Sequence, residues 1–406
     1  MNYDVTKIRE DFPMLRQQVY NKPLVYLDNG ATTQKPRSVI DCINRFHLER
    51  NSSIHRGVHY LSEQATEAYE EARKTVQKFI NAAHSHEVLF TSGTTGSING
   101  LAFSFGERYI REGDEIIVTE MEHHANIVPW QMLCERKKAR LRVIPFADDG
   151  TLVTSRLTDL LTRATRLVAV IHVSNALGTV NPVDEIIRIA HDRNIPVLVD
   201  GAQAIQHGTV DVQKMDCDFY AFSGHKLYGP TGIGILYGKE KWLLELPPYQ
   251  GGGDMVDVVT FEKTTYNVLP FKFEAGTPNY IGAVALAKAI DYVSAIGMEN
   301  IAAYEKELLA YGTKKLLDLG YVTLYGNSPR KSSILSFNLQ GIHPYDAGMV
   351  LDKLGIAIRT GTHCAQPVMQ HYGIEGTIRA SLAMYNTTEE LNKLEEGVKK
   401  VKTMFG

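Results

Sequence analysis

Short apolar runs alternate with segments of helical period between about residues 70 and 240. The runs predicted as strands span residues 87–91, 115–119, 141–145, 167–173, 197–200, 219–222 and 234–237. Amphipathic segments such as 184–192 lie between them. Strands separated by helices predict βαβ units and a mostly parallel sheet with both faces covered. We therefore predict an α/β fold for this part of the chain.

The C-terminal part has a different pattern. Helical segments at 281–319 and 388–404 flank short strand-like runs at 333–338 and 356–359. This pattern predicts a smaller α+β unit, and the helix at 281–319 is long enough to bridge two domains. We expect an N-terminal arm at 1–24 that packs with the small domain, a large domain at 25–290 and a small domain at 291–406.

Composition excludes several classes of protein. The 406 residues are 44% hydrophobic and 22% charged, and their formal net charge is -3. This balance predicts no nucleic-acid or membrane partner. The N-terminus has no apolar signal region, and no apolar run approaches the roughly 20 residues that span a bilayer. Cys42, Cys134, Cys217 and Cys364 are scattered without a CxxC pair, which favours a reducing cytoplasm over disulfides or a zinc site.

Ligands of open α/β sheets bind beyond the carboxyl ends of the strands, so the residues that follow each strand are the candidates for a site. Thr94 and Thr95 follow Gly93 at the predicted start of a helix, which is a suitable place for a phosphate, although any helix N-cap looks similar. His123 and His124 are adjacent and cannot share a helix face, so we expect no metal site there. Either one histidine is exposed and one packed, or one imidazole lies flat against an aromatic ligand.

Asp200 closes an apolar strand, and Lys226 lies with Ser223 and His225 in a glycine-flanked turn after another strand. A buried carboxylate needs a cation, which a salt bridge or a protonated pyridine nitrogen could supply. A lone lysine is normally solvated, but a desolvated amine in this turn could reach a cofactor aldehyde. Phosphate-binding hydroxyls, an acid for a ring nitrogen and a lysine for the aldehyde together indicate a pyridoxal 5'-phosphate site.

The sequence resembles the SufS-type (type II) cysteine desulfurases of the class V aminotransferase superfamily, which are fold-type I pyridoxal-phosphate enzymes. The resemblance runs nearly end to end and is carried by segments 26–36, 55–62, 121–131, 172–182, 199–204, 223–237, 251–255, 273–279, 359–367 and 379–387. It implies a large domain with a mostly parallel seven-stranded sheet and a smaller α+β C-terminal domain.

The resemblance also implies roles for individual residues. Lys226 would bind the cofactor covalently and act as the base, while Asp200 would keep the pyridine nitrogen protonated and His123 would stack on the ring. The remaining cofactor contacts would be Thr94, Thr95, Gln203, Ser223 and His225, with Thr277 contributed across a homodimer interface. The substrate carboxylate would be bound by Asn175, Arg359 and Arg379.

Cys364 stands in the sequence RTGTHC at 359–364, where the resembled family holds its sulfur-accepting thiol. An inert buried thiol is the alternative, and we accept that alternative for the other three cysteines. Proximity to His363 and two arginines favours a thiolate at Cys364. Gly96 and Gln250 stand where some relatives carry Glu, and we expect these departures to affect the level of activity and the coupling to a partner.

The resemblance implies conversion of L-cysteine to L-alanine with a persulfide on Cys364, which a SufE- or SufU-type acceptor would carry to iron–sulfur cluster assembly. L-Selenocysteine is a possible second substrate. Three alternatives remain open at this point: a selenocysteine lyase, a kynureninase-like hydrolase, and a non-catalytic cofactor-binding scaffold.

Overall fold

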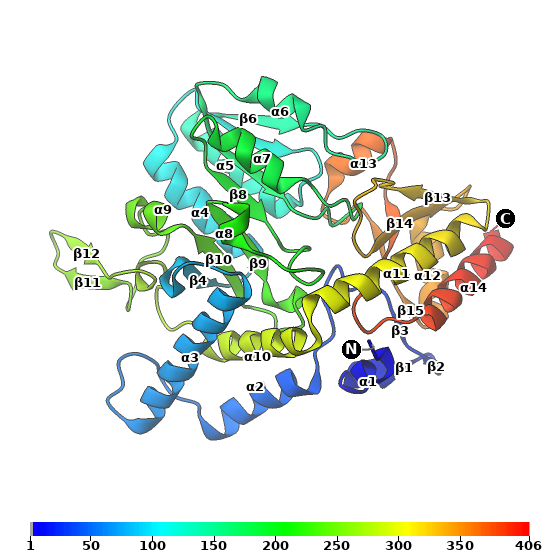
Figure 1. Ribbon diagram of the computed structural model, residues 1–406, viewed down its shortest axis with the longest axis horizontal. Helices are drawn as coiled ribbons and strands as arrows, with labels where there is room; N and C mark the ends of the chain where they lie inside the picture. The colour runs from blue at the N-terminus through cyan, green and yellow to red at the C-terminus, as the bar shows by residue number, and fades with distance from the viewer. Residues whose placement is uncertain (1–2, 406) are drawn as a thin grey trace.

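The computed structural model describes residues 3–405, and a seven-stranded sheet lies at its centre (Figure 1). The strand order is β4-β10-β9-β8-β7-β5-β6, and β10 is antiparallel to both of its neighbours while the other pairs are parallel. The strands are β4 Val88–Thr91, β5 Glu115–Thr119, β6 Arg140–Ile144, β7 Thr165–Ile171, β8 Val197–Asp200, β9 Phe219–Ser223 and β10 Gly234–Gly238. The predicted α/β fold with a mostly parallel seven-stranded sheet is confirmed.

Successive residues of the central strands enter two different apolar cores. Leu167 and Ala169 of β7 belong to one core with Trp130, whereas Val168 and Val170 belong to a larger one. Because both faces are covered, the strands are apolar throughout instead of alternating with polar residues. The helices of this part are α2 Arg37–Glu49, α3 Tyr60–Phe79, α4 Thr94–Tyr109, α5 Val128–Lys137, α6 Ser155–Leu160, α7 Val183–His191, α8 Val212–Met215, α9 Glu240–Glu245 and α10 Tyr280–Ile296.

The single helix predicted at 281–319 is wrong. The chain forms α10 and then α11 Met298–Leu317, which meet at an angle of 74°. Gly297 between them has φ +93, a backbone conformation that glycine adopts at little cost and that side chains rarely allow. Helix α10 packs against α2 and α3, while α11 packs against α14 Thr388–Phe405 and the strands β13 and β14. Within residues 3–405 no single helix is long and apolar enough to cross a membrane, although α10 and α11 together pass that test as a bent pair.

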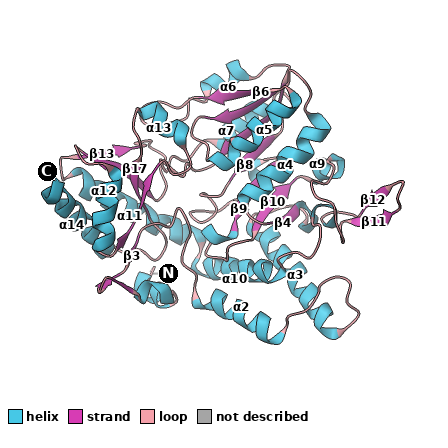
Figure 2. Cartoon of the chain, turned by 180° about the vertical axis from the view of Figure 1, so that it is seen from behind, coloured by secondary structure: helices cyan, strands magenta, loops and turns pink. Residues whose placement is uncertain are grey.

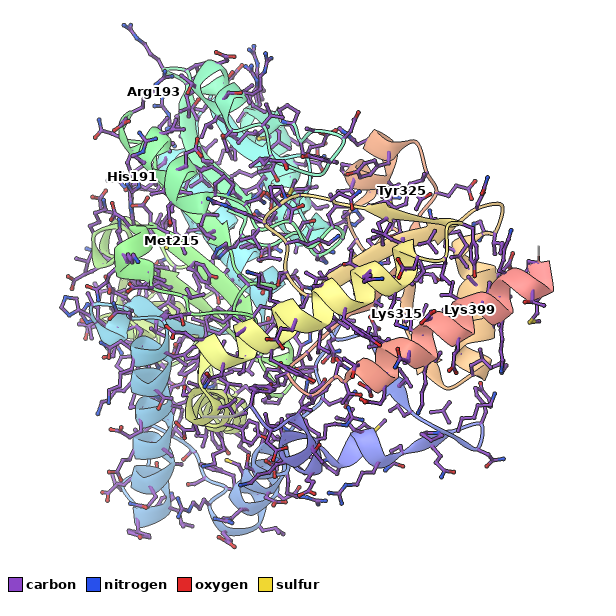
Figure 3. The ribbon with its side chains drawn as sticks, turned by 45° about the vertical axis from the view of Figure 1, so that its right-hand side comes forward. His191, Arg193, Met215, Lys315, Tyr325 and Lys399 are labelled. Atoms are coloured by element: carbon purple, nitrogen blue, oxygen red, sulfur yellow. The ribbon has the colours of Figure 1, made fainter. Side chains whose placement is uncertain are left out.

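A four-stranded antiparallel sheet forms the centre of the C-terminal part, in the order β13-β14-β17-β16. Its strands are β13 Val322–Tyr325, β14 Ile334–Leu339, β16 Arg359–Gly361 and β17 Thr377–Ser381, accompanied by the helices α12 Pro344–Lys353 and α13 Gln366–Tyr372. Glu395 of α14 forms salt bridges with Lys315 of α11 and Lys399 of α14. The two lysines lie near each other in Figure 3. The predicted strand 356–359 is split, because β15 Ile356–Ala357 leaves this sheet to pair with β3 Val25–Tyr26.

The N-terminal segment contacts the C-terminal part of the chain (Figure 2). The ring of Tyr3 stacks on Tyr304 at 4.3 Å, and its hydroxyl donates to the carbonyl of Met384. Arg9 forms a salt bridge of 3.1 Å with Glu390. These contacts agree with an arm that packs on the small domain, but the exact domain limits at 24 and 290 stay predictions.

The remaining elements are short. They are α1 Val5–Glu10, η1 Pro13–Arg16, β1 Gln18–Val19, β2 Lys22–Pro23, η2 Ser85–Glu87, η3 His124–Asn126, η4 Gly224–Lys226, the hairpin of β11 Val256–Val259 and β12 Thr264–Tyr266, and η5 Phe271–Phe273. The two of these that matter for the site are η3, which follows β5, and η4, which follows β9.

Candidate active site

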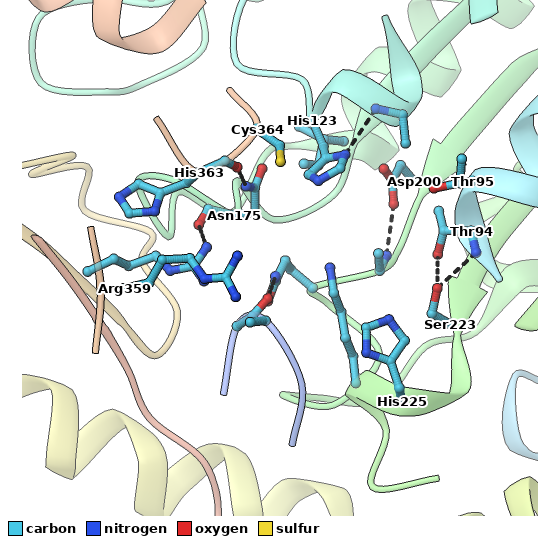
Figure 4. A pocket seen from close by; sticks show the side chains of 18 residues that line it. Thr94, Thr95, His123, Asn175, Asp200, Ser223, His225, Arg359, His363 and Cys364 are labelled. Atoms are coloured by element: carbon cyan, nitrogen blue, oxygen red, sulfur yellow. Dashed lines mark hydrogen bonds between the residues drawn. The ribbon is translucent and has the colours of Figure 1, made fainter. Parts of the chain in front are cut away.

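A cavity of about 210 Å³ lies where the carboxyl ends of the central strands face the C-terminal part (Figure 4). Twelve residues predicted for the site line it: Thr94, Thr95, His123, Asn175, Asp200, Gln203, Ser223, His225, Lys226, Arg359, Cys364 and Arg379. The thirteenth, Thr277, is exposed and lies outside this cavity. The cavity wall also includes Gly30, Ala31 and His363, which sequence reasoning did not assign to ligand binding.

One end of the cavity is formed by the start of helix α4. The backbone N–H of Thr94 donates to the Ser223 hydroxyl at 2.8 Å, and the two hydroxyl groups lie 2.8 Å apart. A Cβ on Gly234 would lie 2.4 Å from the Cα of Gly93, so this glycine is what allows β10 to approach the turn so closely. Unpaired N–H groups and the helix dipole at such an N-terminus favour an anion such as a phosphate.

Lys226 is the last residue of η4, directly after β9. Burial lowers the pKa of its amine to about 8, an effect that the Asp200 carboxylate opposes and the Arg379 guanidinium reinforces. A large fraction of this amine is therefore neutral near pH 8, and a neutral amine can attack an aldehyde or accept a proton.

Hydrogen bonds from the N-terminal segment hold the turn of Lys226. The carbonyl of His225 accepts from the Thr32 hydroxyl at 3.1 Å, from the Thr33 N–H and hydroxyl at 3.1 Å each, and from the Lys35 amine at 3.0 Å. The Thr33 hydroxyl also accepts from the N–H of Tyr228 at 2.9 Å. The sequence marks the segment 26–36 as a motif but gives these residues no role, because hydrogen bonds to a backbone carbonyl far away in the chain leave no pattern in the sequence.

Asp200 is the last residue of β8 and is only 1% exposed. Burial raises the pKa of its carboxyl group, and one oxygen accepts from the N–H of Ala202 at 2.9 Å. In the described part of the chain no cation lies within salt-bridge distance of it, so the salt-bridge alternative finds no partner. A buried carboxylate without a cation at the wall of a cavity fits a cationic ligand group.

His123 follows β5 and faces the cavity as a neutral imidazole. Burial lowers its pKa to about 3, with Lys226 contributing in the same direction, and its Nδ1 accepts from the N–H of Ala125 at 3.0 Å. The preceding Glu122 is fully buried, and burial raises its pKa to about 8. Its carboxyl oxygens accept from the side chains of Thr119 and Asn126 and from the N–H of Ile171, at 2.7, 2.7 and 2.8 Å. Glu122 thus ties the histidine turn to the ends of two strands.

The cavity wall opposite the start of α4 carries two arginines, Arg359 and Arg379, that both donate to the carboxylate of Asp28. Asp28 accepts from the Nη2 of Arg379 at 3.3 Å and from the Nε of Arg359 at 3.2 Å. The Nη1 of Arg379 donates to the carbonyl of Asn175 at 2.9 Å. Two buried atoms here have no protein partner, namely the Nε of Arg379 and the Oδ1 of Asn175. An unsatisfied guanidinium N–H in a cavity wall is a suitable donor to a substrate carboxylate.

Cys364 is exposed, and its loop has an unusual backbone. Both His363 and Cys364 have positive φ, at +53 and +55, which is uncommon for residues with side chains. Burial lowers the pKa of His363 to about 3, so its imidazole is neutral and does not supply the positive charge that we expected it to bring to the thiol. Arg359 and Arg379 line the same cavity wall.

Taken together, these residues fit pyridoxal phosphate. The helix start suits its phosphate, Asp200 suits its ring nitrogen and the buried amine of Lys226 suits its aldehyde. Among residues 3–405 no cluster of three or more His, Cys, Asp and Glu side chains is arranged to hold a metal ion.

Comparison with known proteins gives the same picture. The family model of class-V aminotransferases matches residues 25–394. A cysteine desulfurase of Salmonella agona (strain SL483) is 52% identical over 407 residues, covering 100% of both chains. Among solved structures, the cysteine desulfurase CsdA of Escherichia coli is 35% identical over 100% of both chains with a TM-score of 0.93. A cysteine desulfurase of Thermococcus onnurineus NA1 is 38% identical over 98% of both chains, also with a TM-score of 0.93.

Proposed function

The chain belongs to the class V aminotransferase family and is a pyridoxal-phosphate-dependent cysteine desulfurase, and from this premise we propose that Cys364 takes the sulfur of L-cysteine as a persulfide. The observation that carries the proposal is that Lys226 and Cys364, far apart in the sequence, line one cavity. An amine that can move the α-proton and a thiol that can accept sulfur are the two groups that the reaction needs.

When bound, pyridoxal phosphate supplies an aldehyde that captures the amino group of cysteine and a ring that withdraws electrons from its α-carbon. Asp200 would hold the pyridine nitrogen in its protonated form, because a buried carboxylate is most stable beside a positive charge. Lys226 takes the α-proton, because burial leaves much of its amine neutral near pH 8. His123, which is also neutral, would pack against the face of the cofactor ring.

The arginine wall orients the substrate. The free Nε of Arg379 donates to the cysteine carboxylate, with Asn175 and Arg359 beside it. This contact fixes the direction in which the substrate sulfur points and aims it at Cys364.

The Cys364 thiolate then attacks the substrate sulfur. A sulfur–sulfur bond forms and the carbon–sulfur bond breaks, leaving its electron pair on the β-carbon. The β-carbon takes a proton, and Lys226 returns the proton it removed to the α-carbon, which gives alanine. The products are L-alanine and the Cys364 persulfide.

Replacing the acceptor thiol tests the proposal. Cys364→Ala should keep the visible absorbance of the bound cofactor and lose roughly 10²-fold or more of its alanine production, because no nucleophile remains for the sulfur. Cys42→Ala, which removes a half-buried thiol on α2, is the matched control and should behave as the parent. Alanine production by Cys364→Ala at the parental rate would refute the role of Cys364.

We further propose a homodimer in which Thr277 of one chain completes the phosphate site of the other. Support comes from the exposure of Thr277 outside the cavity of its own chain and from exposed apolar side chains on the β11–β12 hairpin, where Val258 and Val259 are 54% and 62% exposed. Thr277→Ala should weaken cofactor retention while leaving the isolated fold intact, and sedimentation should give twice the chain mass.

Transfer of the persulfide sulfur to a SufE- or SufU-type acceptor in the cytoplasm, for iron–sulfur cluster assembly, is part of the same proposal. It is supported by the exposed position of Cys364, which a protein thiol can reach. Capture of the acceptor on persulfidated enzyme is the direct test, and Gly96→Glu and Gln250→Glu would show whether these two positions affect the coupling.

The activity of the relatives favours an enzyme over a non-catalytic scaffold, and over a kynureninase-like hydrolase. Selenocysteine lyase activity stays a prediction. Selenide leaves carbon more easily than sulfide, so Cys364→Ala should retain more of its activity with selenocysteine than with cysteine if that second activity exists.

A further inference from the structure

His124 contacts the loop of Cys364 through both its backbone and its side chain. Its N–H donates to the carbonyl of Cys364 at 2.8 Å, and its imidazole Nε2 accepts from the N–H of Gln366 at 3.2 Å. His124, which follows strand β5 of the seven-stranded sheet, thus binds the backbone on both sides of Ala365, immediately after Cys364.

The loop needs such support because its backbone is strained. Two successive residues with side chains, His363 and Cys364, have positive φ, and each such conformation persists only when surrounding contacts favour it. The Asn175 amide donates to the carbonyl of His363 at 2.6 Å, so each of the two strained residues has its carbonyl bound by a donor from the other part of the chain.

The turn that bears His124 is itself firmly anchored. Glu122, two residues earlier, accepts hydrogen bonds from both neighbouring strand ends and from Asn126, and His123 between them faces the cavity (Figure 4). The group that faces the cofactor ring and the group that holds the cysteine loop are therefore consecutive residues of one short, anchored turn.

We propose that His124 is a positioning residue of sulfur transfer, which fixes the Cys364 loop at a set place relative to the cofactor-facing His123. The inference rests on the proposed role of Cys364 as the sulfur acceptor. It assigns His124 no contact with the substrate and no proton transfer; its Nε2 acts as a hydrogen-bond acceptor for the loop.

The test uses three variants of the holoenzyme. His124→Ala removes the acceptor, His124→Leu removes it while keeping most of the bulk, and His124→Gln keeps an amide oxygen that can accept from Gln366. Single-turnover formation of the Cys364 persulfide from L-cysteine should slow about tenfold or more in the Ala and Leu variants, since small misplacements of reacting groups are costly. The Gln variant should recover most of that rate.

Three further readouts separate positioning from general damage. The cofactor absorbance and the KM for cysteine should stay at the parental values in all three variants, because neither Lys226 nor Arg379 contacts His124. Hydrogen exchange of the amides at 361–366 should accelerate in the Ala and Leu variants and return in the Gln variant. If His124→Ala does not fold, the Leu and Gln pair decides the question by itself.

Persulfide formation at the parental rate in His124→Leu would overturn the inference, and so would equal losses in the Leu and Gln variants. A parallel assay of Cys364→Ala separates the two proposals. If Cys364→Ala still produces alanine at the parental rate, the acceptor role fails; if it does not and His124→Leu is unaffected, only the positioning role fails.

Discussion

The amine of Lys226 lies on a half-buried turn of the large sheet, whereas the thiol of Cys364 lies on an exposed loop of the smaller part. Hydrogen bonds from Thr32, Thr33 and Lys35 converge on the carbonyl that precedes Lys226. The loop of Cys364 instead adopts strained φ values. The difference suits the two roles that we propose, because proton transfer needs a fixed geometry and delivery of sulfur to an acceptor protein needs a thiol that this protein can reach.

The largest expected effect comes from removing the amine. Lys226→Ala should lower alanine production roughly 10³-fold or more, because no other group of the cavity replaces a positioned base. The visible absorbance of the bound cofactor should also change, as the amine no longer binds its aldehyde. Lys226→Arg should be as inactive as Lys226→Ala, since a guanidinium stays charged and cannot act as the base. Measurable activity close to the parental value would show that the half-buried turn of Lys226 is not the catalytic region.

The second effect is on the pH dependence of cofactor uptake. The amine must be neutral to attack the aldehyde, and burial lowers the pKa of Lys226 to about 8. The rate of incorporation into the cofactor-free chain should therefore rise with pH through a midpoint near 8, well below the ordinary lysine value of about 10.4. Asp200→Asn should move the midpoint lower still, because the Asp200 carboxylate favours the charged amine. A midpoint near 10 would mean that water reaches this turn.

A smaller effect should distinguish the stability of the two regions. Thr33→Val removes a hydroxyl that bonds His225 and Tyr228, and it leaves the buried N–H of Tyr228 without a partner. We expect a loss of about 1–3 kcal/mol in the free energy of unfolding, measured by urea denaturation. An unchanged free energy of unfolding would mean that these bonds do not hold the lysine turn.

The smallest effect belongs to the cysteine loop. Thr362 is half-buried, and no hydrogen bond of its side chain is present, so Thr362→Ala should change the free energy of unfolding by less than about 0.5 kcal/mol. It is the matched counterpart of Thr33→Val. A larger loss at Thr362 than at Thr33 would reverse the comparison between the two regions.

The sequence pattern predicted the central sheet well, because buried parallel strands are continuous apolar runs such as 167–171 and their polar ends are easy to recognise. It did not predict the break at Gly297, since a glycine inside a helical pattern is compatible with an unbroken helix. Nor did it predict that the strand at 356–359 divides between two sheets, because the pairing with β3 depends on residues more than three hundred positions away.

Among the candidate site residues, those at or after strand ends could be predicted from the sequence, and Lys226, Asp200 and His123 do line one cavity. The supporting residues could not. Asp28, Lys35 and His124 act through hydrogen bonds to backbone or side-chain atoms of distant segments, and such bonds require no particular spacing along the chain. The lowered pKa of His363 could not be predicted from the sequence for a related reason, because the burial that causes it is a property of the fold.

Helices α10 and α11 meet at an angle at Gly297. Helix α11 has 20 residues and is therefore about 30 Å long, so a tilt of about 2° at this joint displaces its far end by about 1 Å. Helix α11 packs on the sheet that contains β16, the strand that leads into the Cys364 loop. The placement of that loop relative to the central sheet therefore depends on the backbone conformation of one residue that lacks a side chain.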